Sequence, residues 1–391
     1  MQKAASLPLP SAEALAASAA LSARIGEAID AADGWIGFDR YMALALYAPG
    51  LGYYSGGAAK FGRDVRDGSD FITAPELSPF FARTLARQLM QWLDQGLDTV
   101  MEFGAGTGRL AADLLLALEA AGQLPARYLI VELSGELRAR QQATLAERAP
   151  QLASRVQWLD ALPAQFAGVI VGNEVLDAMP VRLYARLGGH WHERGVARQG
   201  QGFGYVDRAL APADVPSALR TLPGDQDLVT ETHAEAEGFV RSLGTMLTRG
   251  AALLIDYGFP AAEYYHPQRT GGTLMCHYRH HAHPDPFLHP GLQDITAHVN
   301  FTGIAEAAVD AGLEVAGFTS QARLLMNAGI GELLMTLDPA DTAHFLPAAN
   351  AVQKLLSEAE MGELFKAIAL VRGMDDSLPL GFAAGDRSHT L

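Results

Sequence analysis

A glycine-rich segment beginning at Glu102 is the part of this sequence best suited to chemistry. It reads Glu102-Phe103-Gly104-Ala105-Gly106-Thr107-Gly108 and joins a predicted strand, residues 99–103, to a helix predicted to begin near Arg109. Glycines permit a tight turn and let a ligand lie directly on the backbone at a helix N-terminus. The segment therefore predicts a cofactor site, whose binding residues would be Glu102, Gly104, Ala105, Gly106 and Gly108.

Two details of this turn indicate which cofactor it binds. A nicotinamide dinucleotide rests its pyrophosphate on a Gly-x-Gly-x-x-Gly turn, whereas this turn is Gly-x-Gly-x-Gly and follows an acidic residue. The anion at Glu102 opposes a pyrophosphate but suits an ammonium or sulfonium group. The pattern favours S-adenosylmethionine, and an NAD-dependent oxidoreductase is the alternative interpretation.

Two more acidic residues follow predicted strands. Glu132 ends the strand predicted at 128–132, where its carboxylate could accept hydrogen bonds from both ribose hydroxyls of the cofactor. Asp160 follows the strand predicted at 155–159 and could accept from the adenine amino group. The alternative for Asp160 is that it caps a helix.

The strand predicted at 168–172 leads into Asn173-Glu174-Val175-Leu176-Asp177-Ala178-Met179-Pro180. Ligands of open α/β sheets bind beyond the carboxyl ends of the strands, so this segment should face the transferable methyl group. Glu174 and Asp177 could hold a guanidinium between two carboxylates, and an arginine acceptor needs a carboxylate to take up its proton. Glu174, Asp177 and Asn173 are thus the candidate catalytic residues. Alternatively, Asp177 caps a short helix, and the other two satisfy loop backbone.

The elements that position these residues alternate regularly along the chain. Short apolar strands, separated by amphipathic helices, indicate a parallel sheet covered on both faces. They are predicted at 99–103, 128–132, 155–159, 168–172 and 251–256, with closing strands at 313–318 and 367–371. The fold class is therefore α/β, with a Rossmann-like doubly wound sheet.

The remaining segments are predicted to be additions to this sheet. We expect N-terminal helices and a cofactor-covering loop in 1–95, the core in 96–180 and 228–258, an inserted β-hairpin in 181–227, an insertion and helical lobe with a closing strand in 259–360, and the last core strand and tail in 361–391. Helices are predicted at 21–31, 39–46, 80–93 and about 323–358, and residues 50–78 are predicted to be loop.

Composition narrows the classes of function. The 391 residues carry 29 basic and 44 acidic side chains, a net charge of −15, which repels nucleic acid. No apolar run is long enough for a membrane helix, and no signal or transit peptide is evident. A cytoplasmic, bacterial-type location follows as an expectation, or the mitochondrial matrix for a eukaryotic source.

The segment 277–298 contains six histidines, so a metal site must be considered. It lacks a cysteine pair and a clear i, i+4 histidine pair on a helix, so we expect no metal and assign the histidines to loop hydrogen bonds.

Cys276 is the only cysteine, which excludes an intramolecular disulfide. We interpret it as a small packing residue rather than a nucleophile.

Several long segments, in this order, resemble the MidA-type family of class I S-adenosylmethionine-dependent methyltransferases, and the likeness spans most of the chain. They are Tyr47-Ala48-Pro49-Gly50-Leu51-Gly52-Tyr53-Tyr54, Asp70-Phe71-Ile72-Thr73-Ala74-Pro75-Glu76-Leu77-Ser78, the segments 102–108 and 173–180, Asp256-Tyr257-Gly258, and Asp294-Ile295-Thr296-Ala297-His298-Val299-Asn300-Phe301.

The resemblance implies a function and further site residues. Mitochondrial members of the family are protein arginine methyltransferases that assist assembly of respiratory complex I, so a protein substrate is implied, such as a complex I subunit. It also implies that the loop with Thr73, Pro75 and Glu76 lies over the cofactor. Two departures stand out: Asn300, where the family leads us to expect aspartate, and a longer lead at 63–69. A cofactor-binding assembly factor that methylates nothing is the remaining alternative.

Overall fold

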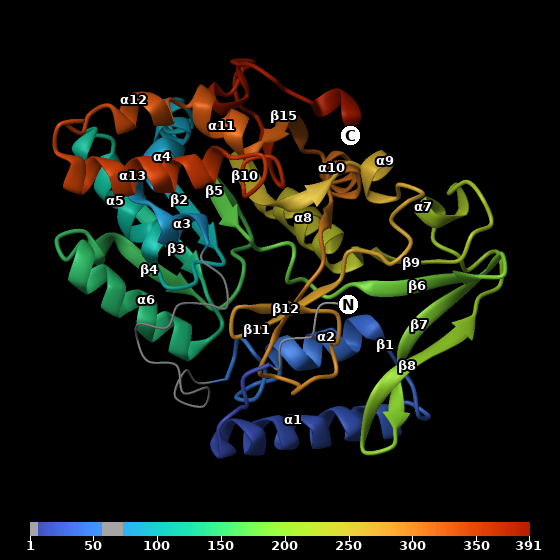
Figure 1. Ribbon diagram of the computed structural model, residues 1–391. Helices are drawn as coiled ribbons and strands as arrows, with labels where there is room; N and C mark the ends of the chain where they lie inside the picture. Colours follow the sequence, from blue (N-terminus) through green and yellow to red (C-terminus); the bar gives the residue numbers. More distant parts are fainter. Residues whose placement is uncertain (1–6, 57–72) are drawn as a thin grey trace. The chain divides into compact units, whose positions relative to one another are not determined.

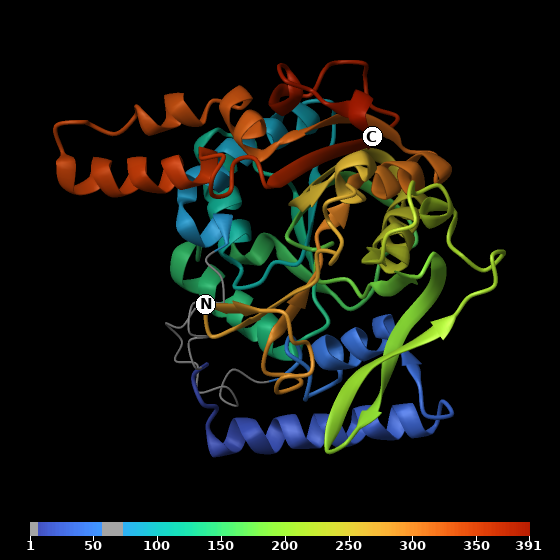
Figure 2. The same cartoon turned by 45° about the vertical axis from the view of Figure 1, so that its right-hand side comes forward.

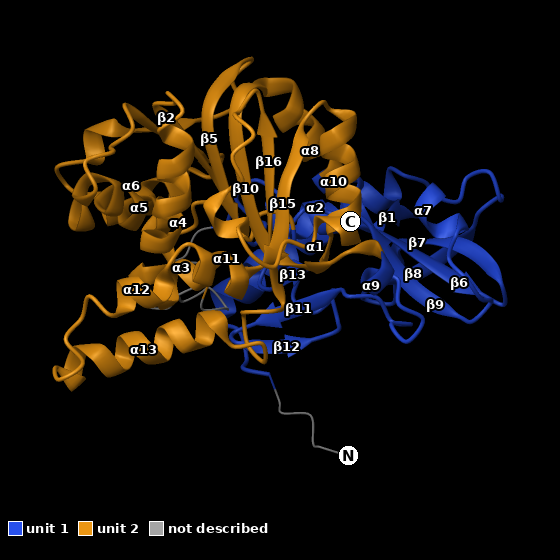
Figure 3. Cartoon of the chain, turned by 90° about the horizontal axis from the view of Figure 1, so that it is seen from above, with its two compact units in different colours: residues 1–71, 177–236, 262–298 blue, residues 72–176, 237–261, 299–391 orange. Residues whose placement is uncertain are grey.

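The computed structural model describes residues 7–56 and 73–391, and the chain divides into two compact units (Figure 3). Unit 1 comprises residues 1–71, 177–236 and 262–298, and unit 2 comprises residues 72–176, 237–261 and 299–391. Both units are discontinuous in sequence, so each contains segments from distant parts of the chain.

Unit 2 contains a mixed sheet with the strand order β15-β16-β10-β5-β2-β3-β4. Its strands are β2 (Thr99–Phe103), β3 (Arg127–Val131), β4 (Val156–Leu159), β5 (Phe166–Asn173), β10 (Leu247–Phe259), β15 (Glu314–Ser320) and β16 (Phe365–Arg372), and β14 (Val299–Asn300) pairs with β10. Neighbouring strands from β4 to β10 are parallel, whereas β16 is antiparallel to both of its neighbours. The predicted Rossmann-like doubly wound sheet is confirmed.

Helices cover both faces of this sheet because its strands are apolar on both sides. Val100 of β2 packs with α4 (Pro79–Leu93) and α5 (Arg109–Ala120) in one core. Phe103 points to the other face, where its ring meets Phe239 of α8 (Ala234–Met246) edge to face. In the same way Phe318 of β15 contacts Phe301 of α10 (Phe301–Asp310).

The helices predicted over 323–358 are present as three separate pieces in unit 2. They are α11 (Gln321–Asn327), α12 (Ile330–Leu334) and α13 (Thr342–Leu356). Figures 1 and 2 show α12 and α13 side by side, and both pack against α4. The sequence between them contains Gly329 with φ of +83° and Pro339, which interrupt a continuous helix.

Unit 1 combines helices with antiparallel sheets. Its elements include α1 (Ala12–Asp30), α2 (Phe38–Tyr47), β1 (Ile36–Gly37), β6 (Arg182–Leu187), β7 (His190–Gln199), β8 (Gly202–Ala209), α7 (Ser217–Arg220), β9 (Leu228–Thr232), β11 (Met275–Tyr278), β12 (His281–His283) and β13 (Asp294–Thr296), while α9 (Ala261–Tyr264) begins at its border. Strands β6 and β7 form an antiparallel hairpin, in which Gly188 and Gly189 join the two strands with φ of +54° and +81°. In the part of the chain that the structure describes, no helix is long and apolar enough to cross a membrane.

Candidate functional site

The glycine turn lies between β2 and α5, where the sequence predicts it. Gly104, Gly106 and Gly108 have φ of +64°, +51° and +83°, a region that other residues rarely adopt. A Cβ on Gly104 would lie 2.8 Å from Cγ2 of Val175, and one on Gly108 would lie 3.0 Å from the Cα of Gln141. The glycines are required both by the backbone conformation and by the close approach of two other segments of unit 2.

Glu102 precedes the turn, and its side chain is buried in the sheet. It alternates with Phe103 along β2, so it points toward the face covered by α4 and α5, where Oε2 accepts a hydrogen bond of 2.5 Å from the Tyr128 hydroxyl. Burial raises the pKa of Glu102 to about 7, although the Tyr128 hydrogen bond favours the charged form. The predicted contact between Glu102 and the cofactor remains a prediction.

Glu132 follows β3 directly and is held by two donors. Its Oε1 accepts from the backbone N–H of Ser134 at 2.8 Å, and its Oε2 accepts from Nε2 of Gln141 at 3.0 Å. Each carboxylate oxygen can accept about two hydrogen bonds, so each keeps one acceptor position. This half-buried carboxylate can receive two hydroxyl donors on a ligand, as a ribose would provide.

Asp160 follows β4 and lies at the surface. No helix begins after it, because the chain continues irregularly to β5, and the helix-cap alternative is therefore wrong. Its Oδ1 pairs with Nη2 of Arg138, which also donates to the carbonyl oxygen of Glu132 at 2.9 Å. Arg138 of α6 (Gly135–Arg148) thereby links the ends of β3 and β4.

The predicted loop over 50–78 contains a short helix, α3 (Ala74–Leu77), which begins after Thr73. The expectation of loop is wrong for these four residues, since Pro75 occupies a first-turn position that needs no N–H donor. The Glu76 carboxylate accepts a hydrogen bond from the Thr107 hydroxyl of the glycine turn. The structure therefore brings Glu76 to the cofactor turn, whereas residues 57–72, including the lead at 63–69, lie outside the described residues.

Asn173 and Glu174 lie at the carboxyl end of β5. Asn173 is 8% exposed, and its Nδ2 donates to Oε1 of Glu174 at 3.0 Å. Among residues 7–56 and 73–391, Oδ1 of Asn173 is buried and has no hydrogen-bond partner. Glu174 has φ of +53°, an uncommon conformation for a residue with a side chain. Together these features provide one buried acceptor available to a ligand, next to a carboxylate that is carried by an uncommon backbone conformation.

Asp256 of β10 supports this pair, and the candidate residues chosen from the sequence did not include it. Its Oδ2 accepts from the backbone N–H groups of Val175 at 3.1 Å and Leu176 at 2.8 Å, and Oδ1 accepts from that of Tyr257 at 2.9 Å. Asp256 is fully buried. The sequence pointed to Asp256 only through the Asp256-Tyr257-Gly258 segment. Its contact with the loop after β5 becomes visible only when β5 and β10 lie side by side in the sheet.

Asp177 belongs to unit 1, whereas Glu174 belongs to unit 2. Asp177 is buried and does not cap a helix, so the alternative that it is a helix cap is wrong. Its carbonyl oxygen accepts a hydrogen bond from the N–H of Ala297 at 3.0 Å. The Tyr47 hydroxyl donates to the neighbouring carbonyl of Ala178 at 2.8 Å. The joint grip of Glu174 and Asp177 on a guanidinium remains a prediction.

Asn300, the residue that departs from the family pattern, caps α10. Its Oδ1 accepts from the backbone N–H of Gly303 at 3.5 Å, as an aspartate in this position could also do. This capping contact gives residue 300 a structural task in unit 2.

The histidine-rich segment forms the small sheet of β11, β12 and β13. Across residues 7–56 and 73–391 there is no group of three or more His, Cys, Asp or Glu side chains that could hold a metal ion.

Cys276 is fully buried in the apolar core of unit 1, and burial raises its thiol pKa. A thiolate nucleophile is therefore disfavoured, and the interpretation of Cys276 as a packing residue is confirmed.

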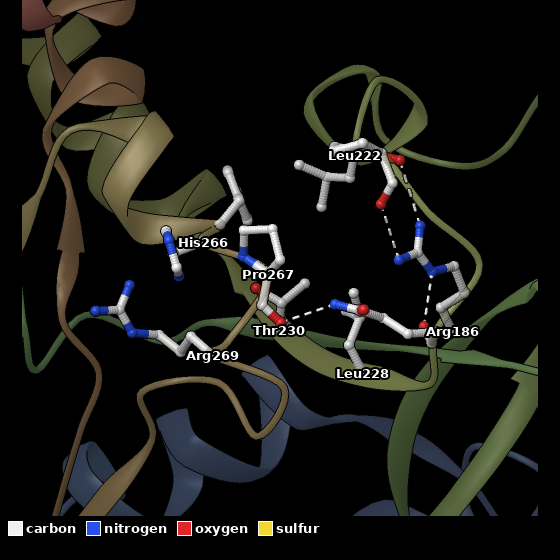
Figure 4. A pocket seen from close by; sticks show the side chains of 10 residues that line it. Arg186, Leu222, Leu228, Thr230, His266, Pro267 and Arg269 are labelled. Atoms are coloured by element: carbon white, nitrogen blue, oxygen red, sulfur yellow. Dashed lines mark hydrogen bonds between the residues drawn. The ribbon is translucent and has the colours of Figure 1, made fainter.

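A pocket in unit 1, lined by Arg186, Thr230, His266 and Arg269 among others, is too small for a cofactor (Figure 4). Its volume of about 20 Å³ is that of a site for a water molecule. Arg186 donates to the carbonyl oxygens of Gln226, Leu222 and Pro223 at 3.0, 3.3 and 3.3 Å. The guanidinium thus stabilises the local fold.

The residues around the glycine turn are compatible with S-adenosylmethionine. The turn offers backbone at a helix N-terminus, Glu132 offers two acceptor positions, and Asn173 offers a buried acceptor. The strand order, with one reversed strand next to the edge among those described, is that of class I methyltransferases. The fold and the site therefore define a class I S-adenosylmethionine-dependent methyltransferase.

Comparison with known proteins gives the family. Residues 82–319 match the family described as "Putative S-adenosyl-L-methionine-dependent methyltransferase", and the chain belongs to this family. A crystal structure of a superfamily member from Burkholderia thailandensis, with S-adenosyl-homocysteine bound, is 62% identical, with a TM-score of 0.95 over 99% of this chain and 100% of the other. These findings establish S-adenosylmethionine, rather than NAD, as the cofactor.

More distant relatives carry a functional name. The mitochondrial protein arginine methyltransferase NDUFAF7 homologue of Drosophila melanogaster is 30% identical, over 85% of this chain and 81% of that protein. The Caenorhabditis elegans homologue is 27% identical, over 84% of this chain and 81% of that protein. The predicted resemblance to the MidA-type family is thereby confirmed.

Proposed function

We propose that this methyltransferase modifies arginine side chains of a protein. The observation that carries the proposal is the Asn173–Glu174 pair: among the described residues the Asn173 amide oxygen is buried without a hydrogen-bond partner, and Glu174 has an uncommon backbone conformation. Strained non-glycine residues concentrate at functional sites, because the fold must hold them there. Val175 follows the pair and lies against Gly104, so the pair is adjacent to the cofactor turn within unit 2.

Each side chain of this segment has a task in the proposal. S-adenosylmethionine supplies the electrophilic methyl group on its sulfonium. The acceptor guanidinium is charged at neutral pH, so a carboxylate must both orient it and accept the proton released on methylation. Glu174 performs this role, Asn173 accepts an N–H through Oδ1, and Asp177 assists.

The cofactor site of the proposal consists of residues from four segments. The turn binds the amino-acid end of the cofactor through Gly104, Ala105, Gly106 and Gly108, with Glu102 beside them. Glu132 accepts the ribose hydroxyls, Asp160 accepts the adenine amino group, and Thr73, Pro75 and Glu76 cover the ligand. The contact of Glu76 with Thr107 supports this last assignment.

A protein substrate is supported by the names of the relatives, which are protein arginine methyltransferases. A net charge of −15 also suits a basic acceptor segment. A respiratory complex I subunit is one candidate acceptor, and the cytoplasm remains the expected location in a bacterium.

The proposal is tested with a methyl-labelled donor and a lysate from cells lacking the protein. We expect label on protein arginine, detected as methylarginine by mass spectrometry, and a loss of roughly 100-fold or more in rate for Glu174→Gln, since general-base and orienting roles each contribute about that much. S-adenosyl-homocysteine affinity should change little. The matched control is Glu147→Gln, which alters an exposed glutamate of α6 and should retain the full rate.

Three results would be informative in other ways. Label on lysine or on a small molecule would refute the arginine acceptor while leaving methyl transfer intact. An undiminished rate in Glu174→Gln would refute the role of that carboxylate. Cofactor binding without any labelled product would favour an assembly factor that does not turn over.

A further inference from the structure

Gln141 is a buried amide in a helix that is otherwise mostly exposed. Within the 14 residues of α6, only Gln141 and Leu145 are buried, and Gln141 is 0% exposed. An apolar residue at this position would pack without the cost of burying an amide, which is tolerated only when its hydrogen bonds are made. The contacts of this side chain therefore indicate what it is for.

Both polar atoms of the Gln141 amide make hydrogen bonds to the protein. Oε1 accepts from Nε1 of Trp158 at 2.9 Å. Nε2 donates to Oε2 of Glu132 at 3.0 Å and to the carbonyl oxygen of Gly106 at 3.2 Å. Because the indole N–H can only donate, and the carboxylate and carbonyl can only accept, the chemistry of the partners fixes which way the amide faces.

The three partners come from three of the four segments that we assign to the cofactor site. Gly106 is the middle of the glycine turn, Glu132 is the carboxylate after β3, and Trp158 lies in β4 just before Asp160. The backbone N–H of Ser134 fixes the other oxygen of Glu132. The carboxylate plane is thus set by one donor on each oxygen, which leaves one acceptor position per oxygen directed elsewhere.

We propose that Gln141 is a positioning residue that holds the Glu132 carboxylate in the orientation that receives the ribose of S-adenosylmethionine, and that it ties this carboxylate to the glycine turn through the Gly106 carbonyl. This inference rests on the proposed role of Glu132. Glutamine is suited to the task because one side chain both accepts from Trp158 and donates twice. Glutamate at this position would place a second carboxylate against Glu132 and against a carbonyl oxygen, reversing two of the three contacts.

The test is calorimetric binding of S-adenosyl-homocysteine and of its 2′-deoxy analogue to the full-length protein. Gln141→Met removes the hydrogen bonds and keeps the volume. We expect the variant to bind S-adenosyl-homocysteine about 10-fold or more weakly, because the Glu132 carboxylate is no longer held in its orientation. In the wild type, the 2′-deoxy analogue should bind much more weakly than S-adenosyl-homocysteine, and we call this loss of binding free energy the 2′-deoxy penalty. In the variant, this penalty should shrink to at most about half.

Two additional variants separate positioning from a purely structural effect. Gln88→Met changes another fully buried glutamine of unit 2, whose side chain contacts Gln91 and the N–H of Gly381. It should lower thermal stability similarly but keep the ligand affinity and the 2′-deoxy penalty of the wild type. Trp158→Phe keeps Gln141 but removes the indole N–H that orients its amide, together with part of the ring, and it should lower the affinity and the 2′-deoxy penalty in the same direction as Gln141→Met.

The proposal is overturned if Gln141→Met and Trp158→Phe keep the wild-type penalty for the 2′-deoxy analogue. It is also overturned if the wild type does not distinguish the two ligands, because Glu132 then does not bind the hydroxyl. Neither result bears on the arginine acceptor, which fails only in the methyl-labelling assay. If Gln141→Met does not fold, Trp158→Phe decides the question by the same comparison.

Discussion

At the scale of single residues, Glu102 shows how burial changes a side chain that the sequence presents as an anion. The sequence places an acid before the glycine turn, and its charge was the reason for preferring a sulfonium ligand to a pyrophosphate. In the fold this carboxyl is buried and accepts a hydrogen bond from Tyr128, and burial raises its pKa to about 7. Its charge therefore changes near neutral pH in the free protein.

This shift makes folding stability depend on pH. The folded pKa of about 7 exceeds the ordinary value of 4.5, so the stabilisation is fully present below pH 4.5 and is lost as the pH rises through 7. Relative to wild type, Glu102→Gln should gain about 2 kcal/mol of unfolding free energy between about pH 5.5 and about pH 8. Urea unfolding of both proteins without ligand measures it, with Glu147→Gln as control. A difference that is constant with pH would contradict the raised pKa.

Residue types in the sequence predicted the acidic candidates at the ends of strands. They did not predict the residues that only orient another side chain. Glu132 and Glu174 could be found because acids after strand ends are exceptional in an apolar pattern. Gln141 could not be found, since a glutamine on an amphipathic helix is usually solvated. Its role depends on contacts with Gly106 and Trp158, which are distant in sequence and adjacent only in the fold.

At the scale of elements, the loop after β5 is held by the neighbouring strand β10. The N–H of Glu174 donates to the carbonyl oxygen of Ile255 at 2.9 Å, and Asp256 accepts from the next two amides. A carboxylate that accepts several backbone N–H bonds is a strong anchor. The uncommon backbone of Glu174 is thus stabilised by β10, because the neighbouring residues Ile255 and Asp256 make these contacts.

Disturbing this anchor should affect turnover more than cofactor binding. Asp256→Asn replaces one acceptor oxygen by a donor, and we expect kcat to fall by about 100-fold, as for a displaced catalytic group. The affinity for S-adenosyl-homocysteine should stay within about threefold, because Glu132 is held by Ser134 and Gln141 and does not contact the loop after β5. Steady-state kinetics and calorimetry give the two numbers.

A matched control for this variant exists in the same unit. Asp386→Asn also alters a carboxylate that anchors backbone, because Oδ1 of Asp386 accepts from the N–H of Phe318 at 2.8 Å. It should retain the wild-type kcat. Equal losses in both variants would mean that Asp256 acts through general stability and would refute its role in holding the loop.

The elements themselves were largely predictable because their apolar periods are regular. The sequence placed β2 at the residues where it lies, and the other core strands within a few residues of their ends. The short helix α3 was missed, since four residues with a proline and an acid resemble a loop when read without their contacts. Helices were predicted over 323–358, but not the bounds of α11, α12 and α13, because Gly329 alone does not fix where a helix stops.

At the scale of the whole molecule, segments that are far apart in sequence assemble within each unit. In unit 1 the Tyr54 hydroxyl donates to Asp294 at 2.9 Å, joining two of the segments that resemble the MidA-type family. In unit 2 the turn contacts the β5 loop and α6. The sequence predicted the presence of both groups of segments, but it could not assign Glu174 and Asp177 to different units.

The central claim is that the glycine turn and Glu132 bind the methyl donor, and titration calorimetry tests it most directly. Wild type and Glu132→Ala are titrated with S-adenosylmethionine, S-adenosyl-homocysteine and NAD. We expect the wild type to bind both adenosyl ligands and not NAD, and Glu132→Ala to bind them about 10-fold or more weakly, the cost of removing a charged acceptor from two hydroxyls. Unchanged affinity in Glu132→Ala, or binding of NAD alone, would contradict the claim.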